Sequence, residues 1–382
     1  MKKIFLFFLL LSQLTYAQEK YSGVSTHFEA LGTPYGGCGV PPDLVETEYF
    51  VALNVYHSPG VGTSWPRPLT GADTLFKGEF NNGRNCGRWL KVSIMEDCIG
   101  GTNDGALGQQ FCRGANAQWK HDKYSYAYLN MIVTDACGDN NGWCRDSKYH
   151  LDLHTSSLNK FEKDGQAVSD MNPGHFNNRK IEWEYIKSPG YTGDIDIYFM
   201  QNSQQYWASI LINHLENGIH NVEQKVGQQW VKLSTNSDMG QAFIVDPSEQ
   251  PYRIRVYDAE DKLINNGREY IFSLPASCGG KCPVPASKAT YQVYDPVITS
   301  VYEESKDKFF YVGGANDNHL IMWDLNESVN SVQLVDLLGR TIKEFKVNSV
   351  KGSLEPGSLS GGCYRVVFYG NNSILGCKTL IK

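Results

Sequence analysis

The distribution of ten cysteines constrains the fold of this chain more than any other feature of its sequence. Six lie in the first part of the chain, at Cys38, Cys86, Cys98, Cys112, Cys137 and Cys144. The other four form two later pairs, Cys278 with Cys282 and Cys363 with Cys377. An even number of cysteines in an exported chain favours disulfides, and this grouping predicts that they pair within separate domains. Spacing alone does not choose among the connectivities that six cysteines allow.

Zinc binding is the alternative use of clustered cysteines. No Cys-x-x-Cys pair occurs, and the histidines near the cysteines lack zinc-finger spacing. We therefore expect disulfides in all three groups, and we expect neither a metal nor another cofactor.

The N-terminus predicts export. Lys2 and Lys3 precede a short apolar stretch at 4–11, and polar residues then lead to the small residue Ala17. This is the pattern of a secretory signal peptide, here residues 1–17, with cleavage before Gln18. The apolar stretch is too short for a membrane anchor, and no later stretch approaches the length of a membrane span. We therefore expect a secreted protein.

The length of the chain indicates how many domains it forms, and its net charge disfavours some classes of ligand. The chain has 382 residues, enough for two or three domains. Its formal net charge is -6, and loss of the two lysines in the signal peptide makes it -8. An acidic protein is a poor candidate for binding nucleic acid or anionic membranes, and we expect weak adhesion to acidic pectin. Neutral glucans remain compatible with this charge.

Short apolar runs separated by turn residues predict an all-β chain. In the first domain, residues 22–174, the runs at 129–136 and 149–154 are typical of strands. One helix is expected at 157–165, capped by Thr155 or Ser156 and ended by Gly165.

Residues 178–277 carry a different pattern, with alternating apolar and polar positions at intervals of about ten residues. This pattern predicts an antiparallel sandwich of immunoglobulin-like size, and its strands are expected at 181–186, 194–199, 207–213, 221–226, 229–234 and 252–258. Gly, Pro and an expected Cys278–Cys282 loop mark residues 278–300 as a linker. Residues 301–382 form a third β region.

Two carboxylates are the strongest candidates for chemistry in the first domain. Asp135 and Asp152 lie on expected strands on either side of a cysteine-bounded loop. A carboxylate there can accept hydrogen bonds from sugar hydroxyls, or donate a proton to a glycosidic oxygen if its pKa is raised. The alternative is structural: Asp135 caps a turn and Asp152 is a hydrogen-bonded barrel residue.

Motifs around these carboxylates resemble those of expansins. GWC (142–144) followed by HLDLH (150–154) resembles the GGWCN…HFDLS signature, and VTDACG (133–138) resembles the strand before it. GVSTHF, GGCGV and NGRNCGRWLKV resemble earlier parts of the same domain, in family order. Residues 202–233 resemble the expansin carbohydrate-binding domain. The resemblance covers about two-thirds of the chain and implies a six-stranded double-psi β-barrel followed by an immunoglobulin-like β-sandwich.

The resemblance also implies roles for individual residues. Asp152 matches the aspartate on which wall loosening depends in the family, and Asp135 matches a neighbouring groove aspartate. Thr26 matches a groove threonine that orients the sugar or the aspartate. Tyr206 and Trp207 match an aromatic pair that stacks on glucose rings. The implied ligand is cellulose, xyloglucan or another plant cell-wall glucan, bound by a monomer.

Four departures from the expansin pattern bear on the substrate. A third binding aromatic is replaced near Met239, Phe28 stands at a position where bacterial expansins often carry threonine, and a long insertion follows Cys98. The acidic net charge also differs from that of basic expansins. Within that insertion, Trp119 either adds a sugar subsite or packs against the barrel. We read Trp230 as a core residue of the sandwich.

Two alternatives to a non-hydrolytic binding protein remain. Family 45 endoglucanases share the barrel and take their acid from the aspartate that matches Asp152, and their base from an aspartate near the N-terminus. In this chain the N-terminal segment THFEALG (26–32) contains no aspartate, and Glu29 is displaced by one residue, which reverses the face on a strand. The other alternative is a barwin-like protein that binds chitin or peptidoglycan, although barwin-like proteins lack the second domain.

The C-terminus resembles a type IX secretion sorting domain, a small β-sandwich. Segments 332–345 and 352–382 carry the match, through Asp336, Gly339, Arg340, Gly362, Tyr364 and Lys378. The resemblance implies passage across an outer membrane by the type IX secretion machinery, followed by release or attachment to the cell surface. Cys363 and Cys377 are expected on adjacent strands and are expected to pair. A third binding module is the alternative.

Overall fold

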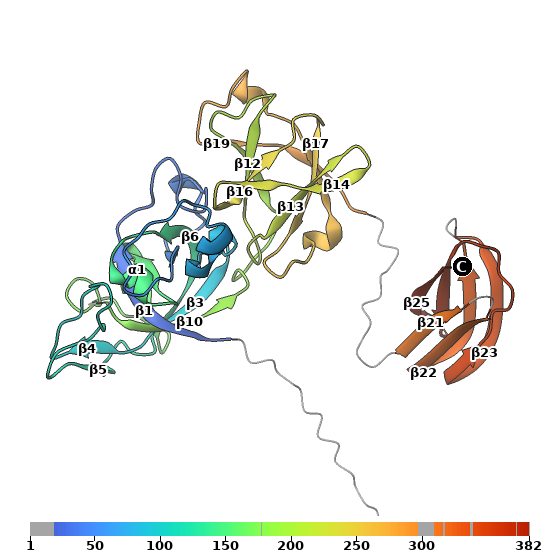
Figure 1. Ribbon diagram of the computed structural model, residues 1–382, viewed down its shortest axis with the longest axis horizontal. Coiled ribbons are helices and arrows are strands. Elements are labelled where there is room, and N and C mark those ends of the chain that lie inside the picture. The colour runs from blue at the N-terminus through green and yellow to red at the C-terminus, as the bar shows by residue number, and fades with distance from the viewer. Residues whose placement is uncertain are drawn as a thin grey trace, which may run out of the picture. The chain divides into compact units, whose positions relative to one another are not determined.

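The computed structural model describes residues 19–176, 178–296, 309–315, 318–336, 339–371 and 373–381. The expected signal peptide lies outside these residues. The chain divides into two units, residues 1–296 and 297–382 (Figure 1), and each is described by itself. In the described residues, no helix is both long and apolar enough to cross a membrane.

The first unit begins with a closed six-stranded barrel. Its strands are β1 (Tyr21–Phe28), β2 (Phe50–Asn54), β3 (Trp89–Ile94), β6 (Tyr128–Cys137), β7 (Leu151–His154) and β10 (Lys180–Ile186). They run in the order β2-β7-β1-β10-β3-β6, and pairing of β2 with β6 closes the barrel. The β1–β7 and β2–β6 pairs are parallel, and the other pairs are antiparallel. The predicted six-stranded barrel is therefore confirmed.

The barrel interior is filled by alternate residues of these strands. Leu53, Val92, Met131, Leu151 and Leu153 are completely buried in one core. Because side chains on a strand alternate between its two faces, the residues between them point to the outside of the barrel. This alternation places Asp152, between Leu151 and Leu153, on the outer face of β7.

Strand β10 corrects the expected boundary between the two domains. Residues 181–186 do form a strand, but it pairs with β1 and β3 of the barrel rather than with strands of the sandwich. Ile181 and Trp183 are buried in the barrel core. An alternating pattern identifies a strand but does not say which sheet it joins, and this is why the sequence placed it wrongly.

The helix expected at 157–165 is also wrong. A short 3-10 helix, η4 (Thr155–Lys160), is followed by a hairpin of β8 (Glu162–Lys163) and β9 (Gln166–Ala167). Asp164 and Gly165 form its turn, with φ angles of 53° and 75°. An Asp-Gly pair with positive φ at both residues is typical of a two-residue hairpin. Gly165 therefore serves a hairpin turn and not a helix terminus.

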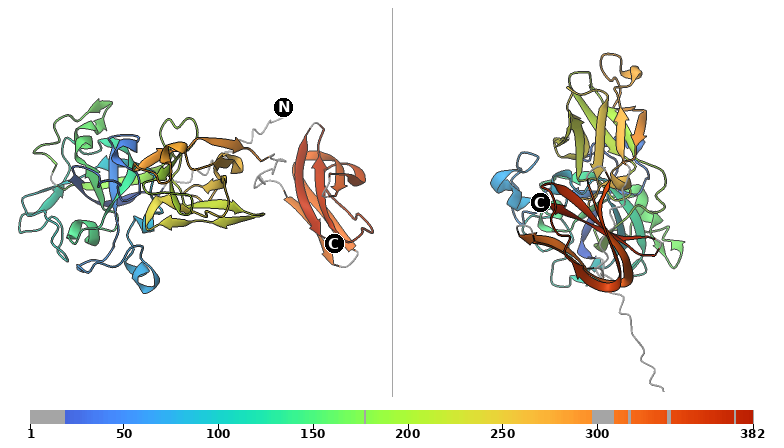
Figure 2. Two further views of the ribbon diagram at one scale, coloured as in Figure 1. Left: turned by 90° about the horizontal axis from the view of Figure 1, so that it is seen from above. Right: turned by 90° about the vertical axis from the view of Figure 1, so that its right-hand side faces the viewer.

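The sandwich follows the barrel within the first unit (Figure 2). One sheet has the order β15-β16-β12-β11-β19 and the other β14-β13-β17-β18-β20. The strands of both sheets are β11 (Asp196–Met200), β12 (Ala208–Asn213), β13 (Asn221–Val226), β14 (Gln229–Lys232), β15 (Ser234–Asn236), β16 (Met239–Val245), β17 (Tyr252–Tyr257), β18 (Glu269–Phe272), β19 (Ala286–Lys288) and β20 (Tyr291–Tyr294). The predicted sandwich is confirmed.

Two features of the sandwich differ from the sequence prediction. Residues 286–294, expected in a linker, contain β19 and β20, which form one edge of each sheet. Trp230 does not belong to the core between the sheets. It lies on β14, partly exposed, and the guanidinium of Arg255 covers its ring at 4.5 Å.

Four disulfides connect cysteines within the predicted groups. They are Cys38–Cys86, Cys98–Cys112, Cys137–Cys144 and Cys278–Cys282. Pairing within the groups of six and two is therefore confirmed for these eight cysteines.

In the second unit, the described residues form one five-stranded sheet. Its strands are β21 (Phe309–Ala315), β22 (Asn318–Val335), β23 (Thr341–Leu354), β24 (Cys363–Tyr369) and β25 (Ile374–Ile381). Strands β24 and β25 are neighbours, but Cys363 lies opposite Ile381, and Cys377 lies opposite Val367. Cys377 is a free thiol. The expected Cys363–Cys377 disulfide is wrong, because the register separates these cysteines by four positions along the sheet.

Candidate functional site

The candidate site begins with a hydrogen bond between the parallel strands β1 and β7. Thr26 and Asp152 are direct partners in the strand register. The Thr26 hydroxyl donates to Oδ1 of Asp152 over 2.7 Å. The structure thus brings two predicted site residues together, 126 residues apart in sequence.

His150 extends this hydrogen bond into the protein interior. It is completely buried directly before β7, and its Nε2 lies 3.0 Å from the Thr26 hydroxyl oxygen. Burial lowers the pKa of His150 to about 3, so the imidazole is neutral over the physiological range. Sequence reasoning missed His150 as a site residue, although it begins the HLDLH motif.

Asp135 lies on the other side of β2 from Asp152. Ala52 of β2 is the register partner of Asp135 on β6 and also of Asp152 on β7. The two aspartates are therefore two strand spacings apart, about 10 Å between their backbones. Oδ1 of Asp135 accepts the backbone amides of Gly37 at 2.6 Å and Ala136 at 2.9 Å. Both predicted carboxylates thus lie on one face of the barrel.

Burial raises the pKa of both carboxyls. For Asp152 the pKa rises to about 6: loss of solvent is the main cause, the Thr26 hydrogen bond opposes it, and the nearby charges of Asp139 and Asp135 add to it. For Asp135 burial again raises the pKa, while the two backbone amides and the positive charge of Arg67 oppose the rise. Asp152 therefore changes protonation state close to pH 6.

A pocket of about 430 Å³ lies beside Asp135, between the barrel and the sandwich. Gly37, which binds Asp135, is part of its wall. Its lining residues are Pro34, Tyr35, Gly36, Gly37, Arg67, Ser237, Asp238 and Met239. Met239, the position where a third binding aromatic was expected, thus contributes a thioether side chain to the pocket.

Arg67 and Asp238 join the two domains across this pocket. Arg67 Nε donates to Oδ2 of Asp238 over 2.7 Å, and the arginine side chain stays about one-third exposed. Sequence reasoning missed this pair, because its members are 171 residues apart and neither belongs to a motif. The guanidinium adds fixed hydrogen-bond donors to a surface otherwise rich in acceptors.

Tyr206 and Trp207 lie in the turn between β11 and β12. The turn is closed by backbone hydrogen bonds between Gln204 and Trp207 in both directions. Tyr206 is 73% exposed and Trp207 is 40% exposed. The hydroxyl of Tyr35, a pocket residue, accepts the backbone amide of Gln201 at the start of the same turn, over 2.9 Å. Hydrogen bonds to Gly37 and Tyr35 of the pocket wall therefore connect this wall both to Asp135 and to the start of the turn that carries the two aromatic residues.

Glu29 lies on the opposite side of the β1–β7 pair from Asp152. Its carboxylate accepts a hydrogen bond from the hydroxyl of Thr155 over 3.2 Å. His27, which points away from Thr26 on β1, contacts the same hydroxyl through Nδ1 over 2.8 Å. Glu29 therefore shares the His27 face, and it does not face Asp152.

The insertion after Cys98 packs against the barrel. It contains a hairpin of β4 (Asp97–Ile99) and β5 (Gln118–Lys120), and its Phe111 ring stacks on Trp143 at 4.5 Å. Trp143 belongs to the short helix α1 (Gly142–Asp146). The ammonium of Lys180 lies over the Trp119 ring at 4.9 Å, which favours packing over a subsite for this tryptophan.

One group of residues in the described chain has metal-ligand chemistry. The sulfurs of Cys137 and Cys144 and a ring nitrogen of His150 lie within 4.8 Å of one another. The two sulfurs form a disulfide, so they offer no thiolate to a metal ion. This geometry fits a structural disulfide rather than a metal site.

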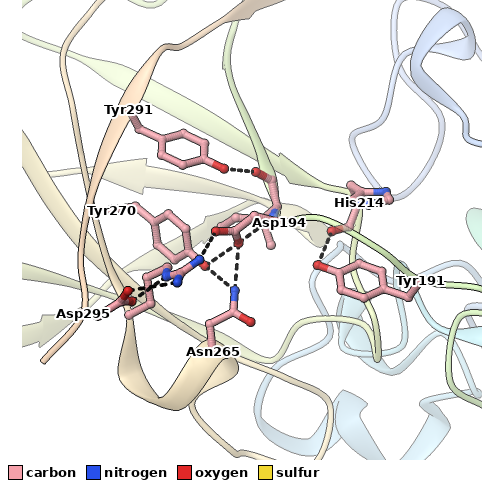
Figure 3. Close-up of polar contacts among 9 residues, drawn as sticks. Tyr191, Asp194, His214, Asn265, Tyr270, Tyr291 and Asp295 are labelled. Carbon is pink, nitrogen blue, oxygen red and sulfur yellow. Dashed lines mark hydrogen bonds and ion pairs between the residues drawn. The ribbon is translucent and has the colours of Figure 1, made fainter. Parts of the chain in front are cut away.

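A separate polar cluster in the sandwich is built around Asp194 (Figure 3). Its carboxylate accepts hydrogen bonds from the Tyr270 hydroxyl at 2.7 Å, the Asn265 amide at 2.8 Å and the Arg268 guanidinium at 2.8 Å. Arg268 also binds both carboxylate oxygens of Asp295. These hydrogen bonds connect Asp194, just before β11 of one sheet, to residues on or beside β18 and β20 of the other sheet.

Comparison with known proteins finds similarity in solved structures only. No family model and no curated protein matches the sequence. An expansin from Clavibacter michiganensis is 19% identical, with a TM-score of 0.39, over 64% of this chain and 89% of that chain. A mutant of that expansin in complex with cellohexaose is 17% identical, with a TM-score of 0.38 and the same coverage. A β-glucuronidase from Ruminococcus gnavus is 13% identical, with a TM-score of 0.16, over 52% of this chain and 35% of that chain.

Proposed function

We propose that this chain is a secreted expansin-like protein that binds cellulose, xyloglucan or a related cell-wall glucan and loosens plant-type walls without hydrolysis. The observation that carries the proposal is the Thr26–Asp152 pair on a closed six-stranded barrel, with Asp135 on the same face. We assign the barrel, which ends with β10, and the sandwich, which ends with β20, to the two binding domains that the sequence placed at 22–174 and 178–277.

The carboxylates of the barrel and the exposed aromatic rings of the sandwich both match groups on a β-glucan. Glucose units carry hydroxyls at their edges, and the carboxylates of Asp152 and Asp135 are hydrogen-bond acceptors for them. The two faces of each ring carry apolar C–H groups, which pack on exposed aromatic rings such as Tyr206 and Trp207. A neutral polymer also avoids repulsion by the acidic protein.

The surroundings of the carboxylates support binding without hydrolysis. An inverting glycosidase holds a water between an acid and a base about 6.5–9.5 Å apart. Glu29, the expected candidate for the base, faces the other side of the strand pair. Between Asp135 and Asp152 lies Ala52, which packs with Phe28 and the Cys137–Cys144 disulfide. Neither Glu29 nor Ala52 therefore supplies a base that faces Asp152.

The experiment that tests the proposal measures soluble sugar release together with retention on the solid polymer. The mature protein is incubated with cellulose, mixed-linkage glucan and xyloglucan beside Asp152→Asn, Asp135→Asn and Glu29→Gln. We expect retention on at least one glucan, extension of wall strips under load, and no oligosaccharides by mass spectrometry. Oligosaccharides that disappear in Asp152→Asn and Asp135→Asn would instead assign an endoglucanase with Asp135 as the base. Retention on chitin or peptidoglycan alone would assign a barwin-like function.

We further propose that residues 301–382 act as a type IX sorting domain. Contacts between two of the matched residues support this proposal: the carboxylate of Asp336 accepts hydrogen bonds from the backbone amide of Arg340 at 2.9 Å and from its Nε at 2.7 Å. Fusion of this segment to an exported fluorescent protein, in a bacterium with the type IX machinery, should deliver the reporter outside the cell. Asp336→Ala should retain it in the periplasm, and equal export of both fusions would contradict the proposal.

A further inference from the structure

We propose that His150 is a positioning residue that fixes the direction of the Thr26 hydroxyl and thereby stabilises the carboxylate form of Asp152. The geometry behind this is a chain of two hydrogen bonds, 3.0 Å from His150 Nε2 to the Thr26 oxygen and 2.7 Å from that oxygen to Asp152 Oδ1. The structural part of the inference is independent of the proposed function. Its effect on wall loosening rests on that function.

Counting protons gives two possible directions for the Thr26 hydroxyl. A threonine hydroxyl has one proton, so it donates to one neighbour and accepts from the other. If Thr26 donates to Oδ1 of Asp152, His150 carries its proton on Nε2 and donates to Thr26. If Thr26 donates to His150 Nε2, the imidazole proton is on Nδ1, and Thr26 can accept only from an Asp152 that is protonated on Oδ1. The tautomer of His150 therefore decides whether Oδ1 of Asp152 receives a proton donor.

The surroundings of the imidazole favour the first arrangement. His150 Nδ1 is buried and has no hydrogen-bond partner in the part of the chain that the structure describes, and the backbone of Val24 opposes the effect of burial on the pKa of the imidazole. A buried N–H without an acceptor is rarer and less stable than a buried acceptor without a donor. The proton therefore belongs on Nε2, where Thr26 accepts it, and this arrangement directs the Thr26 proton to Oδ1, which favours the carboxylate form of Asp152.

The hydrogen bond from Thr26 opposes every other influence on the pKa of Asp152. Burial and the negative charges of Asp135, on β6, and Asp139, before α1, all favour the protonated carboxyl, and the Thr26 hydrogen bond favours the carboxylate. From β2 the neighbour is the uncharged Ala52. His150 itself stays neutral, so it acts through the direction of its N–H and not through a charge.

For binding, this leaves a carboxylate in which Thr26 occupies one oxygen and the other oxygen can accept a hydrogen bond from a ligand. Oδ1 accepts from Thr26, and Oδ2 remains to accept a hydrogen bond from a sugar hydroxyl. When pH falls through the pKa of Asp152, the proton adds to Oδ2, which then becomes a donor, while Oδ1 still accepts from Thr26. His150 thus sets how low the pH must fall before the site exchanges an acceptor for a donor.

The test uses NMR of the mature chain with ¹⁵N-labelled histidine and ¹³C-labelled aspartate. At pH 7.5 we expect the His150 signals of an Nε2–H tautomer, and we expect the same tautomer below the pKa of Asp152. In His150→Asn the shorter amide does not reach Thr26, and we expect the pKa of Asp152 to rise by about half to one unit. In His150→Gln the amide nitrogen replaces Nε2, and we expect a pKa close to that of the wild type.

The outcomes separate this inference from the proposed function. An Nδ1–H tautomer at pH 7.5, or an unchanged Asp152 pKa in both His150→Asn and Thr26→Val, would overturn the inference. If His150→Asn does not fold, Thr26→Val and the wild-type tautomer still decide it. In wall-extension assays, His150→Asn should shift the pH profile upward and His150→Gln should not. Absence of glucan binding by the wild type would contradict the proposed function and leave the NMR result standing.

Discussion

The barrel face around Asp152 and the turn that carries Tyr206 and Trp207 differ in how their side chains are held. Asp152 and Asp135 are largely buried, and hydrogen bonds fix one oxygen of each. The two aromatic rings are exposed. The barrel face is therefore a preorganised and pH-sensitive set of acceptors, whereas the turn offers apolar surface without titratable groups near neutral pH. We infer that adhesion to a glucan and the loosening of a wall are separable properties of the two regions.

The strongest test of this separation is Asp152→Asn. The amide keeps the size of the side chain but removes its charge and one acceptor, so we expect wall extension to fall to background. Retention on cellulose should stay within about twofold of the wild type, because the aromatic turn is unchanged. Extensometry and a pull-down of the same preparation measure the two properties. Parallel loss of both would mean that the two regions act as one site.

The converse test removes the aromatic surface. In a Tyr206→Ala, Trp207→Ala double variant we expect retention on cellulose to fall about tenfold, since burial of exposed ring area contributes roughly 1–2 kcal/mol. Tyr294→Ala is the matched control, because Tyr294 is 47% exposed on the other sheet of the sandwich. If the control lowers retention equally, the adhesive surface has been assigned to the wrong face.

Much of this fold could be predicted from short-range patterns. Alternation identified the strands, and local motifs selected Thr26, Asp135 and Asp152, which the structure places on one face of the barrel. Each of these residues lies within a short continuous motif on a single strand, β1, β6 or β7. Reading such segments requires no knowledge of how distant parts of the chain meet.

The features that were missed depend on contacts between distant segments. Strand β10 joins the barrel because Ile181 and Trp183 fit its core, and nothing in the alternation distinguishes that core from the core of the sandwich. The Arg67–Asp238 pair forms only when the two domains pack together. The Cys363–Cys377 pairing failed for a related reason: adjacency of strands was read correctly, but register decides whether two cysteines can meet.

A smaller effect concerns stability and its dependence on pH. The pKa of Asp152 is raised to about 6 in the folded protein, so the folded state holds the carboxyl proton more tightly than the unfolded state does. The stability that this proton contributes is fully present below the unfolded pKa of about 4 and is lost as pH rises through 6. Asp152→Asn should therefore stabilise the protein at pH 7.5 by about 1–2 kcal/mol, after allowance for a weaker Thr26 hydrogen bond, and have little effect at pH 4.

Chemical denaturation at the two pH values measures this difference. Asp43→Asn, at an exposed carboxylate in η1 (Pro42–Leu44), is the control and should show no comparable difference between the two pH values. A gain for Asp152→Asn that is equal at both pH values would show that packing, and not ionisation, causes it. The aromatic double variant should show no such pH dependence.

The smallest expected effect sharpens the comparison by using the two faces of a single strand pair. Glu29 and Asp152 are both carboxylates near β1 and β7, but Glu29 is exposed and bound to Thr155 on the side away from Thr26. Glu29→Gln keeps an acceptor for Thr155, so we expect wall extension, retention and midpoint of denaturation all within experimental error of the wild type. A loss of wall extension in this variant would place Glu29 at the bound glucan and restore it as a candidate catalytic base. An unchanged protein would confine the acidic chemistry of this barrel to the face that carries Asp152 and Asp135.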